Sequence, residues 1–229
     1  MTITTAQPTN LQIGKFMNKA VKIGIITLAT IGVMTVGVIV FKKKLSKKAL
    51  PPTVQDADLT PEAKAILTEA NKYVGIKEVG DNASFSDKDF EAKMIAIGWK
   101  PNVKMAYCAA FVRMVLLQVA TGNALKFFKS NMTLGSALSF NNFKSAADKK
   151  SEYVEIIKKP ESGCIILYDG HSEICESDID GKNVNVISAN SKFSDGTQGV
   201  VRRTREPEKG IQGTKFEKFL GYVRIKKLS

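Results

Sequence analysis

The chain has 229 residues, enough for one domain of ordinary size and an appendage, and its formal net charge is +12. Residues 1–50 hold eight lysines and no acidic residue, so the remainder carries 26 basic against 22 acidic side chains. Most of the charge therefore belongs to the N-terminal segment, which removes the charge argument for a nucleic-acid-binding function, and no nucleic acid is expected as a partner. The odd number of cysteines, three, argues against a disulfide framework.

An uncharged segment follows a polar and basic tail of residues 1–22. Residues 23–41 contain no charged side chain, and as a helix rising ~1.5 Å per residue they would span roughly 28 Å, close to the thickness of a bilayer core. A cleaved signal peptide would have a shorter apolar run and a small-residue cleavage site, whereas this run ends in Phe41 and three lysines. We expect a transmembrane helix at 23–41 that contacts the lipid bilayer.

Lysines flank this segment on both sides, three before it and five after it. The positive-inside rule favours the side with five, which predicts that the C-terminal domain lies in the cytoplasm. The same lysines are suited to anionic lipid head groups, although a solvated flank explains them equally well. Residues 42–58 form a basic juxtamembrane segment and a stiff linker that contains Pro51 and Pro52.

A folded domain is predicted for residues 59–229. Thr60, Pro61 and Glu62 supply a cap residue, a proline at the first helical position and an acid in the first turn. Helices are expected over 63–73, 89–97 and from about Tyr107 to Ala120. Strands are expected at six later segments: 153–157, 164–168, 171–175, 183–188, 199–205 and 219–225. Helices followed by strands predict an α+β domain in which an antiparallel sheet packs on helices.

A cysteine begins the third predicted helix. Cys108 follows Tyr107 and precedes an apolar stripe that has the i, i+3, i+4 spacing of a buried helical face. A thiol in the first turn lies near unpaired N–H groups and the positive end of the helix dipole, which lowers its pKa. This position favours a nucleophile, and the alternative is an ordinary buried cysteine.

The single histidine of the chain, His171, follows an Asp169-Gly170 turn between two predicted strands. Asn190 lies at the end of the next predicted strand. Together with Cys108 they supply a nucleophile, a base that takes the thiol proton, and an amide whose oxygen can hold the imidazole in its working tautomer. We predict Cys108, His171 and Asn190 as catalytic residues, with strand-end turn chemistry as the alternative for Asn190.

These motifs resemble, in their order and surroundings, the CHAP and NlpC-type cysteine amidase and peptidase families, which have a papain-like fold. The resemblance covers roughly residues 60–227. It rests on Tyr107 to Val112, on Gly163 with the apolar strand after it, on Gly170-His171 and on 189–191, with weaker likeness at 75–78 and 220–224. The segment at 75–78 is similar to a phage-associated subgroup.

The resemblance implies hydrolysis of amide or peptide bonds in bacterial peptidoglycan through an acyl-enzyme on Cys108. His171 would act as base and then as acid, and the backbone N–H of Cys108 would help to bind the oxyanion. Tyr107, Trp99 and Asp169 are expected to line the substrate groove. This chemistry requires no cofactor and no metal.

Three alternatives stay open at this point. Cys164, His171 and Cys175, with or without Cys108, are residue types that bind zinc, although their spacing lacks the short Cys pairs of structural zinc motifs. The second alternative is an inactive module on the same fold that binds cell wall. The third is a structural membrane protein of a virion, whose partners are other virion proteins.

The predicted orientation and the predicted substrate are in tension, because an enzyme anchored in the cytoplasm does not meet the cell wall. Either the anchor is exported against the charge bias, into the host inner membrane, or the protein is packaged in the internal membrane of a bacteriophage. The phage-like segment and the unpaired cysteines favour the packaged, virion-associated lysin.

Overall fold

The computed structural model of the chain describes residues 59–229 except for 104–105, 133–144, 147–150 and 212–217. The predicted tail, transmembrane segment and linker (residues 1–22, 23–41 and 42–58) lie outside the described residues. Among the helices that are described, none is both long and apolar enough to cross a membrane. The membrane anchor therefore stays a prediction from the sequence.

Four α-helices occur in the first part of the described chain. They are α1 (Pro61–Asn71), α2 (Lys88–Ala96), α3 (Cys108–Val119) and α4 (Gly122–Asn131), and a two-stranded ribbon of β1 (Glu78–Val79) and β2 (Ser84–Phe85) lies between α1 and α2. The cap predicted for α1 is present, since Thr60 Oγ1 accepts a hydrogen bond from the Ala63 N–H at 3.1 Å and Pro61 is the first helical residue.

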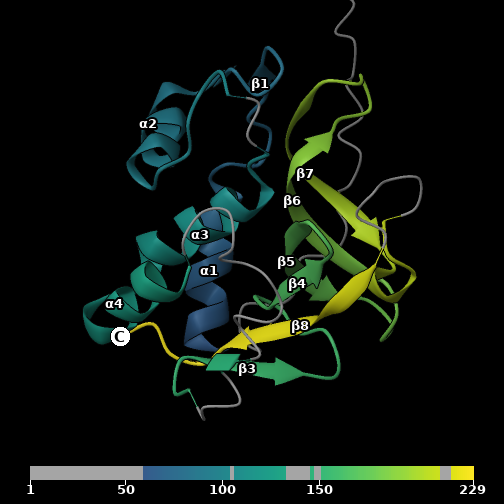
Figure 1. Cartoon of the computed structure of the whole chain (residues 1–229). Coiled ribbons are helices and arrows are strands. Elements are labelled where there is room, and N and C mark those ends of the chain that lie inside the picture. The colour runs from purple at the N-terminus through teal and green to yellow at the C-terminus, as the bar shows by residue number, and fades with distance from the viewer. Residues whose placement is uncertain (1–58, 104–105, 133–144, 147–150, 212–217) are drawn as a thin grey trace, which may run out of the picture. The chain divides into compact units, whose positions relative to one another are not determined.

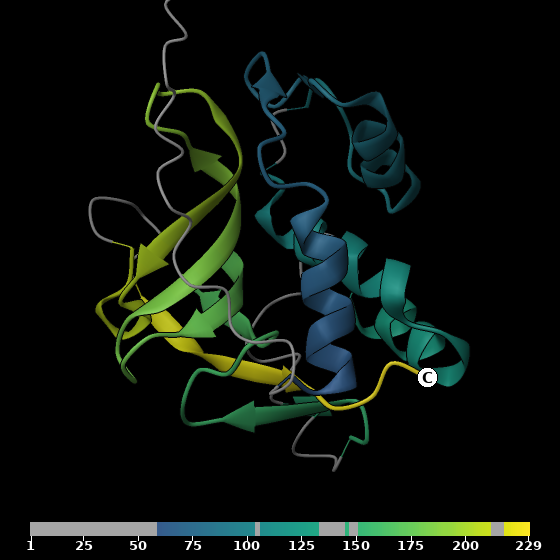
Figure 2. The same cartoon turned by 180° about the vertical axis from the view of Figure 1, so that it is seen from behind.

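The second part forms a six-stranded antiparallel sheet in the order β3-β8-β4-β5-β6-β7. Its strands are β3 (Val154–Ile157), β4 (Ile165–Tyr168), β5 (His171–Asp178), β6 (Val184–Lys192), β7 (Gln198–Arg205) and β8 (Phe219–Ile225), with a 3₁₀ turn η2 (Pro207–Lys209) after β7. Figures 1 and 2 show the helices on one side of this sheet, with α1 and α3 against it.

Side chains on the two faces of the sheet belong to two apolar clusters. One face joins the helices in the main core, which includes Ile174 and Ile187 together with Phe111 and Val115 of α3. The other face forms a smaller cluster that consists of Cys164, Ile166, Tyr168, Cys175, Val184, Val186, Ile211 and Tyr222. Successive side chains of a strand point to opposite faces of the sheet, and here both faces are buried.

The hairpin of β4 and β5 is closed by a two-residue turn, with Tyr168 opposite His171. Asp169 and Gly170 form the turn, and Gly170 has φ +85°, a conformation that glycine adopts without steric cost. The turn fixes the register of the hairpin and so determines which side chains lie beside His171.

The predicted fold class is confirmed at the level of an α+β domain with an antiparallel sheet packed on helices. Helix α4 and the β1–β2 ribbon were not predicted, and β5 and β6 extend beyond the predicted strands. Helix α4 buries Ala124 and Phe128, which lie four residues apart and so share one face of the helix, and its other residues are mostly polar.

Candidate active site

Cys108 is the first residue of α3, as the sequence predicts. Tyr107, the cap residue, makes no side-chain hydrogen bond to the helix, and the first backbone N–H groups of a helix have no intrahelical acceptor. The helix itself is anchored by an apolar face in the main core. This packing holds the thiol, which is 3% exposed, at the positive end of the helix.

His171 is brought to this thiol by the packing of α3 on β5. The Cys108 and His171 side chains are hydrogen-bonded, and Cys108 Sγ lies 3.9 Å from the carbonyl oxygen of Gly170. The imidazole is buried, with 7% of the residue exposed. The nucleophile and the base predicted from the sequence therefore meet in the structure.

The electrostatics of this pair favour a thiolate and an imidazolium. Burial raises the pKa of the Cys108 thiol, but the hydrogen bond and charge of His171, with the N–H groups of Ser172 and Ala109, outweigh it and hold that pKa below its ordinary value. Burial lowers the pKa of His171, yet Cys108 and Glu173 raise it to about 9. At neutral pH the thiol is therefore poised as a nucleophile.

A ring nitrogen of His171 contacts a carboxylate, Glu173, that was not predicted from the sequence. His171 Nε2 lies 3.4 Å from Glu173 Oε1 and 3.3 Å from Ser188 Oγ. Ser188 Oγ in turn lies 2.6 Å from Ser191 Oγ. With Nε2 directed at these groups, Nδ1 is the ring nitrogen left for the thiol, so the contact with Glu173 sets both the orientation and the tautomer of the base.

Glu173 has no exposed surface, and its charge is balanced by its neighbours. Arg205 Nε lies 3.2 Å from Glu173 Oε1, and the Tyr168 hydroxyl donates to Oε2 at 3.3 Å. Burial raises the pKa of this carboxyl, but His171 and then Arg205 lower it to about 2. The carboxylate is thus ionised beside the base at every pH at which the pair would work.

Asn190 does not make the contact predicted for it. Its Oδ1 is buried and accepts no hydrogen bond from any described residue, so this oxygen does not hold the imidazole. Asn190 lies where the β6–β7 register shifts, between Ser188 and Ser191, and has φ +55°. Asparagine tolerates this left-handed backbone, which gives a local reason for the residue at this position.

The three predicted groove residues lie in different surroundings. Trp99 and Tyr107 are 1% and 0% exposed, and both rings pack around Phe85, with centroids 4.8 Å from the Phe85 ring in each case. They are core residues that support the start of α3, and no surface of theirs lines a groove. Asp169 is exposed in the β4–β5 turn, near the candidate site.

A simple signal could have found Glu173. Residues i and i+2 of a strand share a face, so a carboxylate two positions after His171 belongs on the same side of β5. The sequence-based prediction placed the third residue on the following strand, at Asn190. Ser188, which contacts the ring from that strand, lies two residues before it.

The structure does not bring Cys164, His171 and Cys175 together as a zinc site. Among the residues that the structure describes, no three His, Cys, Asp or Glu side chains are grouped so that they could hold a metal ion. Cys164 and Cys175 lie on the face of the smaller apolar cluster, and His171 does not complete a site with them.

Comparison with known protein families, with curated proteins and with solved structures finds no match to this chain. A buried cysteine at a helix N-terminus, a histidine on a strand and a carboxylate beyond the histidine can perform nucleophilic acyl transfer.

Proposed function

We propose that the protein is a membrane-anchored cysteine hydrolase with a papain-like domain, which cleaves amide or peptide bonds of bacterial peptidoglycan. The observation that carries the proposal is the hydrogen-bonded series Cys108–His171–Glu173 at the N-terminus of α3. The substrate class rests on the likeness of the Cys108 and His171 segments to cell-wall amidases and peptidases. Phage or virion association rests on the segment at 75–78 and on the predicted anchor.

The geometry supports a two-step mechanism. The Cys108 thiolate attacks the scissile carbonyl carbon, and the developing oxyanion is stabilised by N–H groups at the start of α3. The imidazolium of His171 protonates the leaving amine, which leaves an acyl-enzyme and a neutral imidazole. His171 then takes a proton from water, the resulting hydroxide equivalent attacks the thioester, and the thiolate and imidazolium are restored.

Glu173 is a positioning residue in this scheme, because it acts on the substrate only through His171. Its charge stabilises the imidazolium that exists before the first step and after the second. Arg205 and Tyr168 hold the carboxylate in place from β7 and β4. The base and its support thus come from three strands of the sheet, β4, β5 and β7.

One observation favours the second function, an inactive module that binds cell wall or forms part of a virion membrane. Cys108 is 3% exposed and His171 7%, so a polymeric substrate reaches the thiol only after neighbouring groups move. A reactive thiolate distinguishes the two functions, because a binding module has no need of one.

The test measures release of soluble muropeptides from purified peptidoglycan by the full chain in mild detergent. We expect release by the parent, none by Cys108→Ala, and a loss on the order of 10²–10⁴-fold for His171→Ala. Cys164→Ala, assayed under reducing conditions, is the matched control, since it removes another buried cysteine at no cost to the site. Sequencing the new termini would identify the bond.

The rate of Cys108 alkylation by iodoacetamide separates the alternatives. The proposed enzyme requires a pH profile for alkylation shifted to lower pH than that of a free thiol. If the parent releases nothing and Cys108 reacts no faster than a free thiol, the binding or structural function replaces the enzyme.

A further inference from the structure

We propose that Cys164 and Cys175 form an intramolecular disulfide that joins β4 to β5 when the protein enters an oxidising compartment. In the structure both are free thiols, and both are buried. The inference is independent of the proposed enzymatic function, because it concerns the opposite end of the hairpin from the Asp169-Gly170 turn.

The backbone hydrogen bonds at the open end of the hairpin place Cys164 beside Cys175. Beyond the Ile165–Ile174 pair, the Cys175 N–H donates to the Cys164 carbonyl oxygen at 2.9 Å and the Cys175 carbonyl oxygen accepts from the Gly163 N–H at 2.8 Å, so Gly163 and Cys164 together lie opposite Cys175, as in a β-bulge. Facing residues of antiparallel strands have Cα atoms about 4.5–5.5 Å apart, within the range of about 4.4–6.8 Å that a disulfide spans. Their side chains share the face of the smaller apolar cluster.

The two thiols are already in contact. A hydrogen bond with Cys164, together with burial and the nearby Asp178 and Glu176, raises the pKa of Cys175 well above its ordinary value. The order of reaction follows from access, because Cys164 lines a pocket and Cys175 has no exposed surface, so Cys164 reacts first and Cys175 second.

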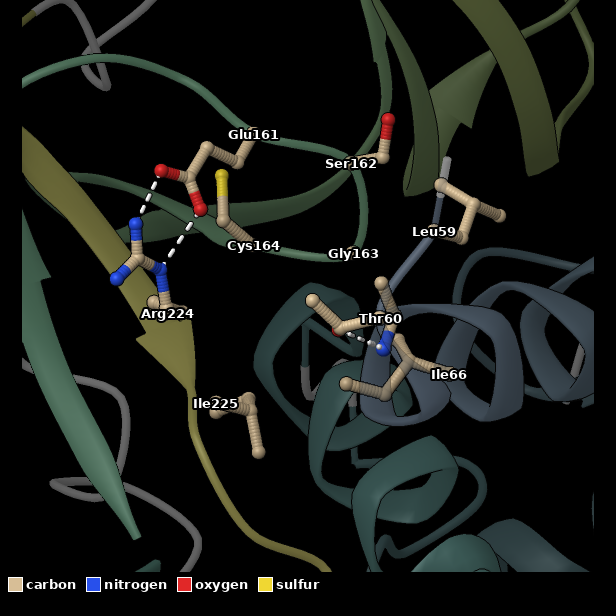
Figure 3. Close-up of a pocket in the computed structure, with 10 residues that line it drawn as sticks. Leu59, Thr60, Ile66, Glu161, Ser162, Gly163, Cys164, Arg224 and Ile225 are labelled. Carbon is tan, nitrogen blue, oxygen red and sulfur yellow. Dashed lines mark hydrogen bonds and ion pairs between the residues drawn. The ribbon is translucent and has the colours of Figure 1, made fainter. Parts of the chain in front are cut away.

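Cys164 lies at a pocket, although only 2% of the residue is exposed. It lines a pocket of about 300 Å³ between the start of α1 and the sheet, together with Thr60 and Gly163. Figure 3 shows its sulfur on the sheet side of this pocket, beside the ion pair in which Arg224 Nε donates to Glu161 at 2.7 Å. A small disulfide reagent can approach Cys164 through this pocket, whereas Cys175 has no exposed surface.

The oxidation is a thiol–disulfide exchange with a small-molecule disulfide as the oxidant. The Cys164 thiolate attacks one sulfur of the reagent, which forms a mixed disulfide and releases the first reagent thiol. Cys175 then attacks the Cys164 sulfur, forms the intramolecular bond and releases the second reagent thiol, which takes the Cys175 proton. Two protein thiols are oxidised and one reagent disulfide is reduced to two thiols.

The bond would hold the strands that carry the candidate site. The loop between the two cysteines contains Tyr168, His171 and Glu173. A cytoplasm keeps such a pair reduced, and an extracellular or other oxidising compartment allows it to close. Pairing of Cys164 with Cys175 leaves Cys108 of α3 as the third, unpaired cysteine.

The test incubates the reduced full chain with hydroxyethyl disulfide, blocks remaining thiols with iodoacetamide under denaturing conditions, and digests with a protease that cuts after glutamate. Cleavage after Glu161, Glu173 and Glu176 leaves Cys164 in residues 162–173 and Cys175 in 174–176. We expect these peptides to be joined by a disulfide, with Cys108 recovered as the alkylated residue. The Cys108→Ala variant should give the same joined peptides.

Recovery of Cys164 and Cys175 as separate alkylated or mixed-disulfide peptides would overturn the proposal, and so would a bond from either one to Cys108. A second readout is thermal unfolding. Closing this short loop should raise the Tm of the wild type by about 5–10 °C relative to its reduced form. The double variant Cys164→Ala/Cys175→Ala should show no such difference, and an unchanged Tm in the oxidised wild type would contradict the stapling of the hairpin.

Discussion

Glu173 is a fully buried charged side chain, and burying a charge costs free energy unless close partners offset the lost hydration. A buried carboxylate loses its hydration, and only close, hydrogen-bonded partners offset that loss. Here the partners are His171 of β5, Arg205 of β7 and Tyr168 of β4. Cys108 and then Glu173 raise the pKa of His171 to about 9, so the carboxylate both gains a partner from the base and favours its charged state.

Replacing Glu173 by glutamine should lower the pKa of His171 toward its ordinary value near 6.5, because the charge that favours the imidazolium is lost. In the wild type, the contribution of protonated His171 to the stability of the folded state is fully present below about pH 6.5, and it is lost as the pH rises through about 9. We therefore expect the alkaline limit of peptidoglycan hydrolysis to fall below 9, and the rate at pH 7 to fall by about 10²–10⁴-fold. The measurement is the pH profile of muropeptide release.

Asn190→Gly is the matched variant for this experiment. Glycine adopts the φ of +55° without strain, so the change removes only the side chain. We expect the pH profile to keep its alkaline limit. A shift in Asn190→Gly together with an unshifted profile in Glu173→Gln would assign the orienting role to Asn190 after all.

At the scale of elements, the hairpin that bears His171 is positioned by a close contact with α1. Gly163, just before β4, has φ +79°, and a Cβ built on it would lie 2.6 Å from the Cα of Ala63 in α1. Its N–H donates to the Cys175 carbonyl oxygen at 2.8 Å. Both the backbone conformation and the lack of a side chain are therefore required here.

Gly163→Ala should destabilise the protein by about 2–5 kcal/mol, the sum of left-handed backbone strain and overpacking against α1. Gly181→Ala is a control with the same φ of +79° and open space around its Cβ, so it should cost only about 1–2 kcal/mol. Denaturant unfolding of the two variants measures the difference. Equal losses would mean that the contact with Ala63 relaxes without cost.

The elements that the sequence predicted well are those with a strong local signal. The cap at Thr60, the apolar stripe after Cys108 and the Asp-Gly turn each specify their own conformation within a few residues. The partner of His171 was missed because it was sought on the following strand, whereas Glu173 lies two positions further along β5 itself. Trp99 and Tyr107 are likewise aromatic residues whose burial depends on the distant Phe85.

At the scale of the whole chain, the predicted anchor determines where the proposed enzyme acts. We expect the full chain to stay with membranes through an alkaline carbonate wash. Replacing Val33 and Val36 by lysine should release it, because each lysine at the centre of a span costs roughly 2.5–3.5 kcal/mol. Immunoblots of the membrane and soluble fractions measure the distribution.

Lysines introduced at Thr4 and Thr5, in the polar tail, add the same charge outside the span and should leave the protein in the membrane fraction. A wild type found in the soluble fraction would contradict the anchor. Protease protection on the same membranes reports the orientation, and a periplasmic domain would exclude the packaged form of the lysin.

The place of β8 in the sheet has a consequence for how the protein is made. β8 pairs with both β3 and β4, yet it leaves the ribosome after β5, β6 and β7. Until Phe219–Ile225 emerges, the apolar strand β4 of a nascent chain has an open edge that another chain can occupy. Translation that stalls between β7 and β8 would therefore favour aggregation, so the yield of folded protein depends on how quickly the ribosome completes that stretch.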